Sequence, residues 1–149
     1  MSTEVMKLAR TDAGLASALR ISVMRLSRRL RNERDVDDDL TANQLAVLGT
    51  LIRSGALTIG DLAAAEKVQP PSMTRTVGCL AGKGLVSRDP HQTDKRVVVV
   101  SLTDRGHEVI AESRRRKDAW LTHRLKELSP AERQILRDAA PLLEQLSHA

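Results

Sequence analysis

One segment of strong β character interrupts a chain whose other segments have the periodicity of helices. Residues 97–102, with the sequence VVVVSL, are the strongest strand candidate, because β-branched side chains favour the pleated backbone. Residues 85–88 (LVSR) are a shorter candidate, and residues 90–95 between the two are rich in turn-forming side chains. We therefore expect a mainly α fold with a small β-hairpin whose tip is polar and partly basic.

Apolar residues at three- and four-residue steps predict helices before the hairpin. Residues 9–34 carry such a stripe, and the acidic stretch at residues 35–39 is expected to end that helix. Residues 41–44 (TANQ) have the capping-box pattern that begins a second helix. Residues 58–61 (TIGD) supply the cap of a short third helix.

Two more helices are predicted after the hairpin. Thr103 is expected to cap a long helix that extends to about residue 128. Residues 129–132 (SPAE) combine an N-cap serine, a first-turn proline and a glutamate at the third position, which together begin a final helix. Pro141 is expected to kink that helix. With 149 residues, the whole chain is expected to form a single domain.

The segment between the short helix and the hairpin predicts the second half of a helix-turn-helix. Pro70 and its neighbour suit a first helical turn, and Met73, Val77 and Leu80 lie within about 60° of one another on a helical wheel. The other face carries small polar side chains and an arginine near the helix N-terminus, which is the part of a recognition helix that enters the major groove. The candidate DNA-contacting residues of this helix are Gln69, Pro70, Ser72, Thr74 and Arg75.

The hairpin adds a second set of candidates. An arginine on a thin loop suits a narrow minor groove, where the negative potential is enhanced. Residues 70–96 carry five Lys or Arg and two Asp, so +3 of the chain's net charge of +5 falls here. Trp120 is the only aromatic residue, which argues against binding single strands by stacking and favours double-stranded DNA. The candidate wing residues are Arg88, His91, Lys95 and Arg96.

Two segments resemble a known family. Residues 94–103 (DKRVVVVSLT) match the D-x-R-x-x-x-V-x-L-T wing signature of the MarR family. Residues 71–75 (PSMTR), followed by Leu80 and residues 84–86, resemble that family's recognition helix and its exit. The order of the predicted elements is similar over essentially the whole chain, and the wing signature is fairly specific.

The resemblance implies a winged helix-turn-helix lobe at about residues 40–103, with dimerisation helices at about residues 9–34 and 104–149. It also implies a triangular homodimer that regulates transcription, most often as a repressor. In such a protein Asp94 would brace the wing by pairing with Arg96, and Arg96 or its neighbour would contact DNA. An exposed pair of this kind contributes at most about 1 kcal/mol on its own.

The apolar stripes of the first and last predicted helices independently favour a homodimer. They exceed what a lobe of this size can cover, and leaving them exposed would create an unusually large apolar patch. A two-fold protein reads two half-sites, and specificity grows accordingly. The alternative is that both helices fold back on their own core. The candidate dimerisation residues are Leu15, Leu19, Leu136, Leu142, Leu143 and Leu146.

Several classes of function find no support in the sequence. The nucleotide-binding, metalloprotease and serine-hydrolase motifs are absent, and the four histidines are scattered. With Cys79 as the single cysteine, neither a disulfide framework nor a four-cysteine zinc site forms within one chain. We therefore expect no catalytic residues, no cofactor and no metal. No apolar run reaches membrane-spanning length and no signal peptide is visible, so we expect a cytoplasmic protein without membrane contact.

Three questions stay open at this level. The family often binds phenolic or other anionic ligands, which implies a possible small anionic effector, although only Trp120 offers a ring for stacking. Cys79 shares the outward face of its helix with Arg75, but it lies far from the helix N-terminus that would lower a thiol pKa. The main alternative to DNA binding is a winged-helix adaptor that contacts an acidic protein partner.

Overall fold

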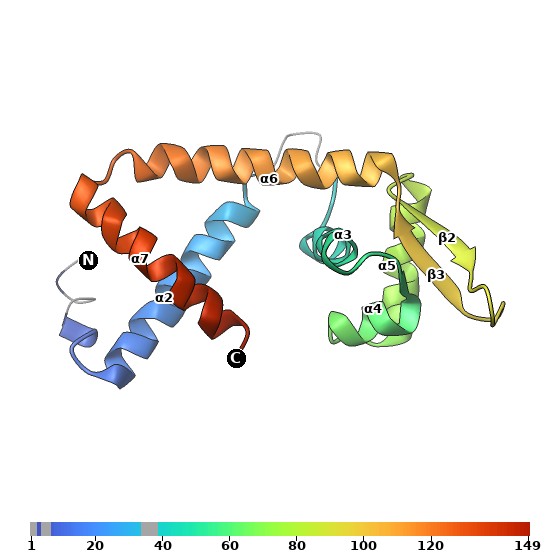
Figure 1. The fold of residues 1–149 in the computed structure, drawn as a ribbon, viewed down its shortest axis with the longest axis horizontal. Helices are drawn as coiled ribbons and strands as arrows, with labels where there is room; N and C mark the ends of the chain where they lie inside the picture. The colour runs from blue at the N-terminus through green and yellow to red at the C-terminus, as the bar shows by residue number, and fades with distance from the viewer. Residues whose placement is uncertain (1–2, 4–6, 34–38) are drawn as a thin grey trace. The chain divides into compact units, whose positions relative to one another are not determined.

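The computed structural model describes residue 3 and residues 7–33 and 39–149. Its main elements in chain order are α2 (Asp12–Arg31), α3 (Ala42–Ser54), β1 (Leu57–Thr58), α4 (Ile59–Ala65), α5 (Pro70–Gly82), β2 (Val86–Pro90), β3 (Val98–Leu102), α6 (Asp104–Leu125) and α7 (Pro130–Ser147) (Figure 1). The predicted mainly α fold with a small hairpin is confirmed. The acidic stretch predicted to end the first helix lies outside the described residues, except for Asp39.

The chain divides into two compact units. Arg34–Arg115 form one, called here the winged unit, and Met1–Glu33 with Arg116–Ala149 form the other, called the helical unit. The division falls inside α6, so this helix belongs to the winged unit at its beginning and to the helical unit at its end.

Side-chain caps begin the helices of the winged unit where the sequence predicts. Gln44 N donates to Thr41 Oγ1 at 3.2 Å, and Thr41 N donates to Gln44 Oε1 at 3.0 Å, which completes the capping box of α3. Gly55 ends this helix with a φ of 74°, a conformation that glycine adopts without steric cost. Asp61 N donates to Thr58 Oγ1 at 3.0 Å and begins α4.

The sheet has three antiparallel strands in the order β1-β3-β2. Val86 pairs with Leu102 at one end of the hairpin, and Pro90 pairs with Val98 near its tip. Leu57 of β1 pairs with Val100 on the other side of β3. Strand β1 was not predicted, because two residues are too few to show an alternating pattern.

A single hydrophobic core holds the winged unit together. Its fully buried side chains come from α3, α4, α5 and β3, and they are Val47, Leu48, Leu62, Val77, Leu80 and Val100. Each such side chain contributes about 1.5–3 kcal/mol by leaving water. Ile110 of α6 joins the same core. Helix α5 and the hairpin are therefore fixed on one packed body.

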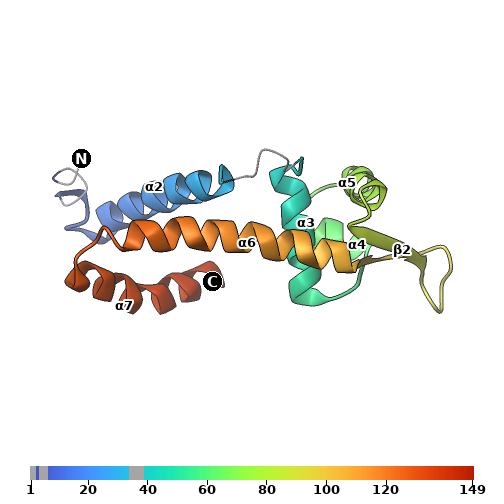
Figure 2. The same cartoon turned by 90° about the horizontal axis from the view of Figure 1, so that it is seen from above.

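The helical unit consists of α2, the end of α6, and α7 (Figure 2). The Trp120 ring of α6 lies under the guanidinium of Arg29 from α2 at 4.6 Å and that of Arg124 at 5.6 Å. Arg133 Nη1 of α7 donates to the Leu128 carbonyl at 2.8 Å. Trp120 thus takes part in the packing of α2 against α6. Among this unit's described hydrophobic residues, Ala18 alone is classed as buried.

Helix ends differ slightly from the predictions. Helix α2 begins at Asp12, because the Thr11 side chain accepts the Gly14 N–H, and it ends at Arg31. Helix α6 ends at Leu125 instead of residue 128. The predicted capping box at Ser129 and Glu132 is confirmed, and α7 continues past Pro141 to Ser147.

Candidate nucleic-acid interface

Helix α5 has two chemically different faces. Its predicted apolar stripe is buried, with Met73 at 2% exposure and Val77 at 0%. The residues predicted to contact DNA remain outside the core, exposed at Gln69, Pro70, Thr74 and Arg75 and half-buried at Ser72. The helix is therefore anchored by one side and offers polar side chains on the other.

The side chains at the start of α5 keep most of their hydrogen-bonding capacity. Thr74 Oγ1 donates to the Pro70 carbonyl at 3.0 Å, and its oxygen can still accept. Arg75 Nη2 donates to Ser72 Oγ at 3.5 Å, which is a long contact. The guanidinium thus retains donors for a phosphate or a guanine edge.

A polar bridge that the sequence analysis missed holds the turn between α4 and α5. Thr50 of α3 is 5% exposed, and its Oγ1 donates to Glu66 Oε1 at 2.5 Å while accepting from Arg53 Nη2 at 3.1 Å. Glu66 is the C-cap of α4, and Lys67 after it adopts a φ of 53°. The bridge joins α3 to the turn between α4 and α5, which sets the direction of α5. Its partners lie 16 residues apart in sequence, so no local pattern reveals it.

The end of α5 is also tied down by polar contacts. Lys83 Nζ donates to the Asp39 carbonyl at 2.8 Å and lies 3.4 Å from Asp39 Oδ2. Gly84 turns the chain with a φ of 73°, and Thr103 Oγ1 donates to its carbonyl at 2.6 Å. The same hydroxyl accepts the Gly106 N–H at 3.1 Å, which confirms Thr103 as the cap of α6.

The Arg88 side chain lies beside α5. It is exposed on β2, and its Nη1 is 4.0 Å from the point where a Cβ on Gly78 would stand. Gly78 follows Arg75 by three positions, so both residues share one side of α5. The structure thus brings Arg88 to the α5 surface, whereas Lys95 and Arg96 occupy the loop between β2 and β3.

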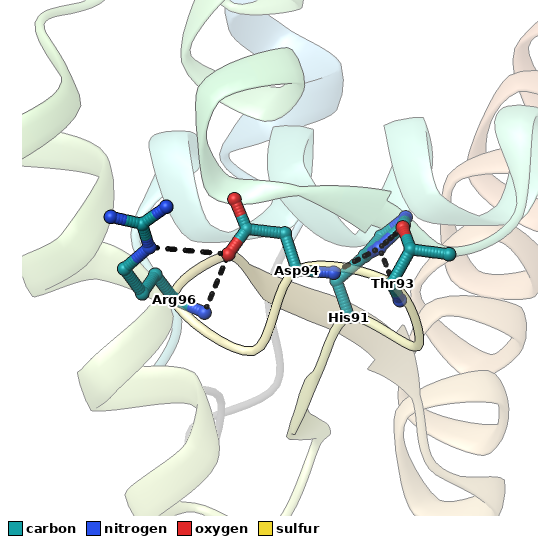
Figure 3. Close-up of polar contacts among 4 residues, drawn as sticks. All are labelled: His91, Thr93, Asp94 and Arg96. Carbon is teal, nitrogen blue, oxygen red and sulfur yellow. Dashed lines mark hydrogen bonds and ion pairs between the residues drawn. The ribbon is translucent and has the colours of Figure 1, made fainter.

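The wing tip carries an arginine that is almost fully exposed. The Arg96 side chain is 94% exposed, and its Nε lies 3.4 Å from Asp94 Oδ1. The same oxygen accepts the Arg96 backbone N–H at 3.1 Å (Figure 3). The predicted Asp94–Arg96 pair is therefore present, and the backbone contact adds to it. Lys95 between them is also exposed.

His91 lies inside the turn and uses one ring nitrogen there. Its Nδ1 is 3.2 Å from Thr93 N, 2.9 Å from Thr93 Oγ1 and 3.4 Å from Asp94 N (Figure 3). The ring is half-buried. We predicted from the sequence that His91 contacts DNA, and nothing in the sequence indicated this inward role.

The candidate dimerisation residues all lie on the surface of the helical unit. Their exposure ranges from 36% for Leu19 to 64% for Leu146. They are joined by further exposed apolar residues of α2 and α7, namely Val23, Met24, Leu26 and Ile135. The alternative that both helices bury their stripes in their own core is wrong for these positions.

A helix-turn-helix followed by a basic hairpin defines a winged-helix DNA-binding protein, and comparisons with known proteins identify its family. Residues 40–98 match the sequence model of the MarR family. The HTH-type transcriptional regulator MT0903.1 of Mycobacterium tuberculosis is 47% identical over 89% of this chain and 92% of its own length. The chain belongs to the MarR family, whose members are DNA-binding transcription regulators and not enzymes.

Solved structures agree with this assignment. A transcriptional regulator from Pseudomonas aeruginosa superimposes with a TM-score of 0.83 at 32% identity, covering 94% of this chain and 98% of that one. BpsR of Bordetella bronchiseptica, whose DNA binding is regulated by 6-hydroxynicotinic acid, matches at 25% identity with a TM-score of 0.62, covering 95% of this chain and 96% of BpsR.

A search of the described helices for membrane-spanning segments found none with the necessary length and apolar character.

Proposed function

We propose that this regulator binds a pseudo-palindromic DNA site as a homodimer, with α5 in the major groove and the wing in the minor groove, and that it represses transcription. The observation that carries the proposal is the division of α5 into a buried apolar stripe and an exposed polar face that includes Arg75. A helix held in this way can enter a groove without exposing its apolar side chains.

The wing complements α5 with positive charge. Arg96 and Lys95 are exposed on a narrow loop, and Arg88 adds a third cation beside α5. Contacts of this kind neutralise phosphates and release counterions, so binding should weaken steeply as salt rises. An arginine in the minor groove gains most at A·T-rich steps, where that groove is narrow.

The second copy of this chain is the partner that best fits the leucine-rich surface of α2 and α7. This surface is apolar over both helices, while its helical unit has little buried core of its own. A homodimer covers such a surface symmetrically and places two copies of α5 on one duplex. Half-sites separated by about 34–36 Å, or by a multiple of that distance, are then expected.

Repression needs only that the bound dimer occupies its site, whereas activation needs an additional surface for the transcription machinery. The regulation of BpsR by 6-hydroxynicotinic acid supports a small anionic effector for this chain as well. A protein with this role works where bacterial DNA is, in the cytoplasm. No cofactor enters the proposal.

Selection of bound duplexes from a random pool tests the whole proposal. We expect an inverted repeat whose half-sites have the helical spacing given above. Arg75→Ala should relax base preference at one position of each half-site, at a cost of about 1–3 kcal/mol. Arg96→Ala should weaken binding without unfolding the protein. Absence of any sequence preference would favour the adaptor function instead.

A further inference from the structure

We propose that His91 is the positioning residue of the wing, holding the turn that presents Arg96, and that it does so through Nδ1 instead of contacting DNA. This inference rests on the proposed role of Arg96 in DNA binding. Its basis is the set of donors around one ring nitrogen (Figure 3). Two are backbone amides, Thr93 N at 3.2 Å and Asp94 N at 3.4 Å, and the third is the Thr93 hydroxyl at 2.9 Å.

These contacts determine the protonation state that the turn requires. A backbone amide can only donate, so Nδ1 must offer its lone pair, and the neutral ring then carries its proton on Nε2. The imidazolium has N–H groups on both nitrogens and would place a hydrogen against two amide hydrogens. The turn is therefore compatible with neutral His91 and incompatible with the charged ring.

The contacts of His91 extend to Arg96 through one intermediate residue. Asp94 is held by its amide on Nδ1, and its Oδ1 accepts both the backbone N–H and the Nε–H of Arg96. The backbone closes the same loop, since His91 N donates to the Val97 carbonyl at 2.8 Å and Val97 N donates to the Asp94 carbonyl at 3.0 Å. Two side-chain acceptors thus fix the backbone that leads to the exposed guanidinium.

Two isosteric substitutions separate the positioning role from a DNA contact. His91→Asn keeps an acceptor where Nδ1 stands, since an Asn carbonyl accepts amides two or three residues ahead in an Asx-turn. His91→Gln places its amide nitrogen near Nε2 and loses the acceptor at Nδ1. We expect His91→Asn to bind the selected duplex within about two-fold of wild type and His91→Gln to lose roughly ten-fold, which corresponds to the loss of about one hydrogen bond.

Rescue of duplex binding by His91→Gln and not by His91→Asn would overturn the proposal.

Nitrogen-15 NMR of the free protein makes the test independent of DNA. His91 should be the Nε2–H tautomer at neutral pH, and the amides of Thr93 and Asp94 should shift and exchange faster in His91→Gln. If Arg96→Ala leaves affinity unchanged, the proposed wing function fails, and these spectra still decide the positioning role. An Nδ1–H tautomer would refute it directly.

Discussion

The winged unit and the helical unit differ in how much of their apolar side-chain surface is buried. The winged unit buries its large apolar side chains internally, with Leu48, Leu62 and Leu80 at 0% exposure. The helical unit has no buried residue in α7 and exposes leucines along α2 and α7. A folded unit normally gains its stability from such burial. The winged unit therefore has a complete core of its own, whereas the helical unit leaves its leucines exposed, as expected if the homodimer proposed above covers them.

The largest expected difference comes from leucine truncation in the two units. Leu48→Ala should lower the free energy of unfolding by about 2–5 kcal/mol, because it leaves a cavity in the core. Leu142→Ala removes a side chain that is 61% exposed, so its effect should come only through association. Urea unfolding at two protein concentrations measures the free energy of unfolding of both variants and shows whether the effect of Leu142→Ala depends on concentration.

The concentration series supplies the control. The midpoint shift caused by Leu142→Ala should be accompanied by a raised dimer dissociation constant in sedimentation equilibrium, since mass action links association to stability. A large destabilisation with no change in association would show that α7 has an internal core after all, and the contrast between the units would fail.

Gly106 tests whether the beginning of α6 truly belongs to the packed core. A Cβ at this position would lie 2.1 Å from the Leu85 carbonyl oxygen, so Gly106→Ala should destabilise the protein by about 1–3 kcal/mol. Gly78→Ala is the matched control within another helix. Its nearest neighbour would be Arg88 Nη1 at 4.0 Å, and alanine should raise stability by about 0.5–1 kcal/mol.

Thermal unfolding monitored by circular dichroism reads both glycine variants. Similar unfolding free energies for the two would mean that the first turn of α6 is loosely packed. The boundary of the winged unit would then lie before this helix instead of inside it.

Much of this architecture was predictable from sequence, because its signals are local. Capping boxes at Thr41 and Ser129, the first-turn proline at Pro70 and the valine-rich strand each depend on residues a few positions apart. The Asp94–Arg96 pair was also predicted, from a wing motif. These features need no knowledge of the tertiary structure.

Contacts between distant segments were missed for the same reason. The two-residue strand β1 exists because Leu57 pairs with Val100, 43 positions later. The orientation of Arg88 toward Gly78 depends on how β2 packs beside α5. For His91 the chemistry was ambiguous, because a histidine in a basic turn suits a phosphate contact and an internal acceptor equally well. The hydrogen bonds of the ring nitrogens decide between a phosphate contact and an internal acceptor. Those hydrogen bonds are formed only in the folded turn.

The bridge from Thr50 to Glu66 joins α3 of the core to the C-cap of α4, just before α5, the helix proposed to enter the major groove. Thr50→Ala removes the hydroxyl that donates to the half-buried Glu66 carboxylate and should cost about 1–3 kcal/mol. Because this contact holds the turn before α5, Thr50→Ala should lose more duplex affinity than a core variant of equal stability. Leu51→Ala is a suitable core variant, because Leu51 is buried. Mild denaturant is added so that the two variants are compared at the same free energy of unfolding. Equal affinities at equal stability would limit Thr50 to a structural role.

The smallest expected effect compares the two capping boxes, which are chemically alike but lie in different units. Thr41→Ala removes the acceptor for Gln44 N in the winged unit, and Ser129→Ala removes the acceptor for Glu132 N in the helical unit. Each should cost about 0.5–2 kcal/mol, since a cap acts on the first helical turn and does not depend on core burial. Thr41→Ser and Ser129→Thr keep the hydroxyl and serve as controls. Denaturant unfolding at a concentration where the dimer is intact should give nearly equal losses. A much larger cost for Ser129→Ala would mean that the stability of the helical unit is limited by the formation of α7 itself. It would then not be limited by the exposure of the leucines on α2 and α7.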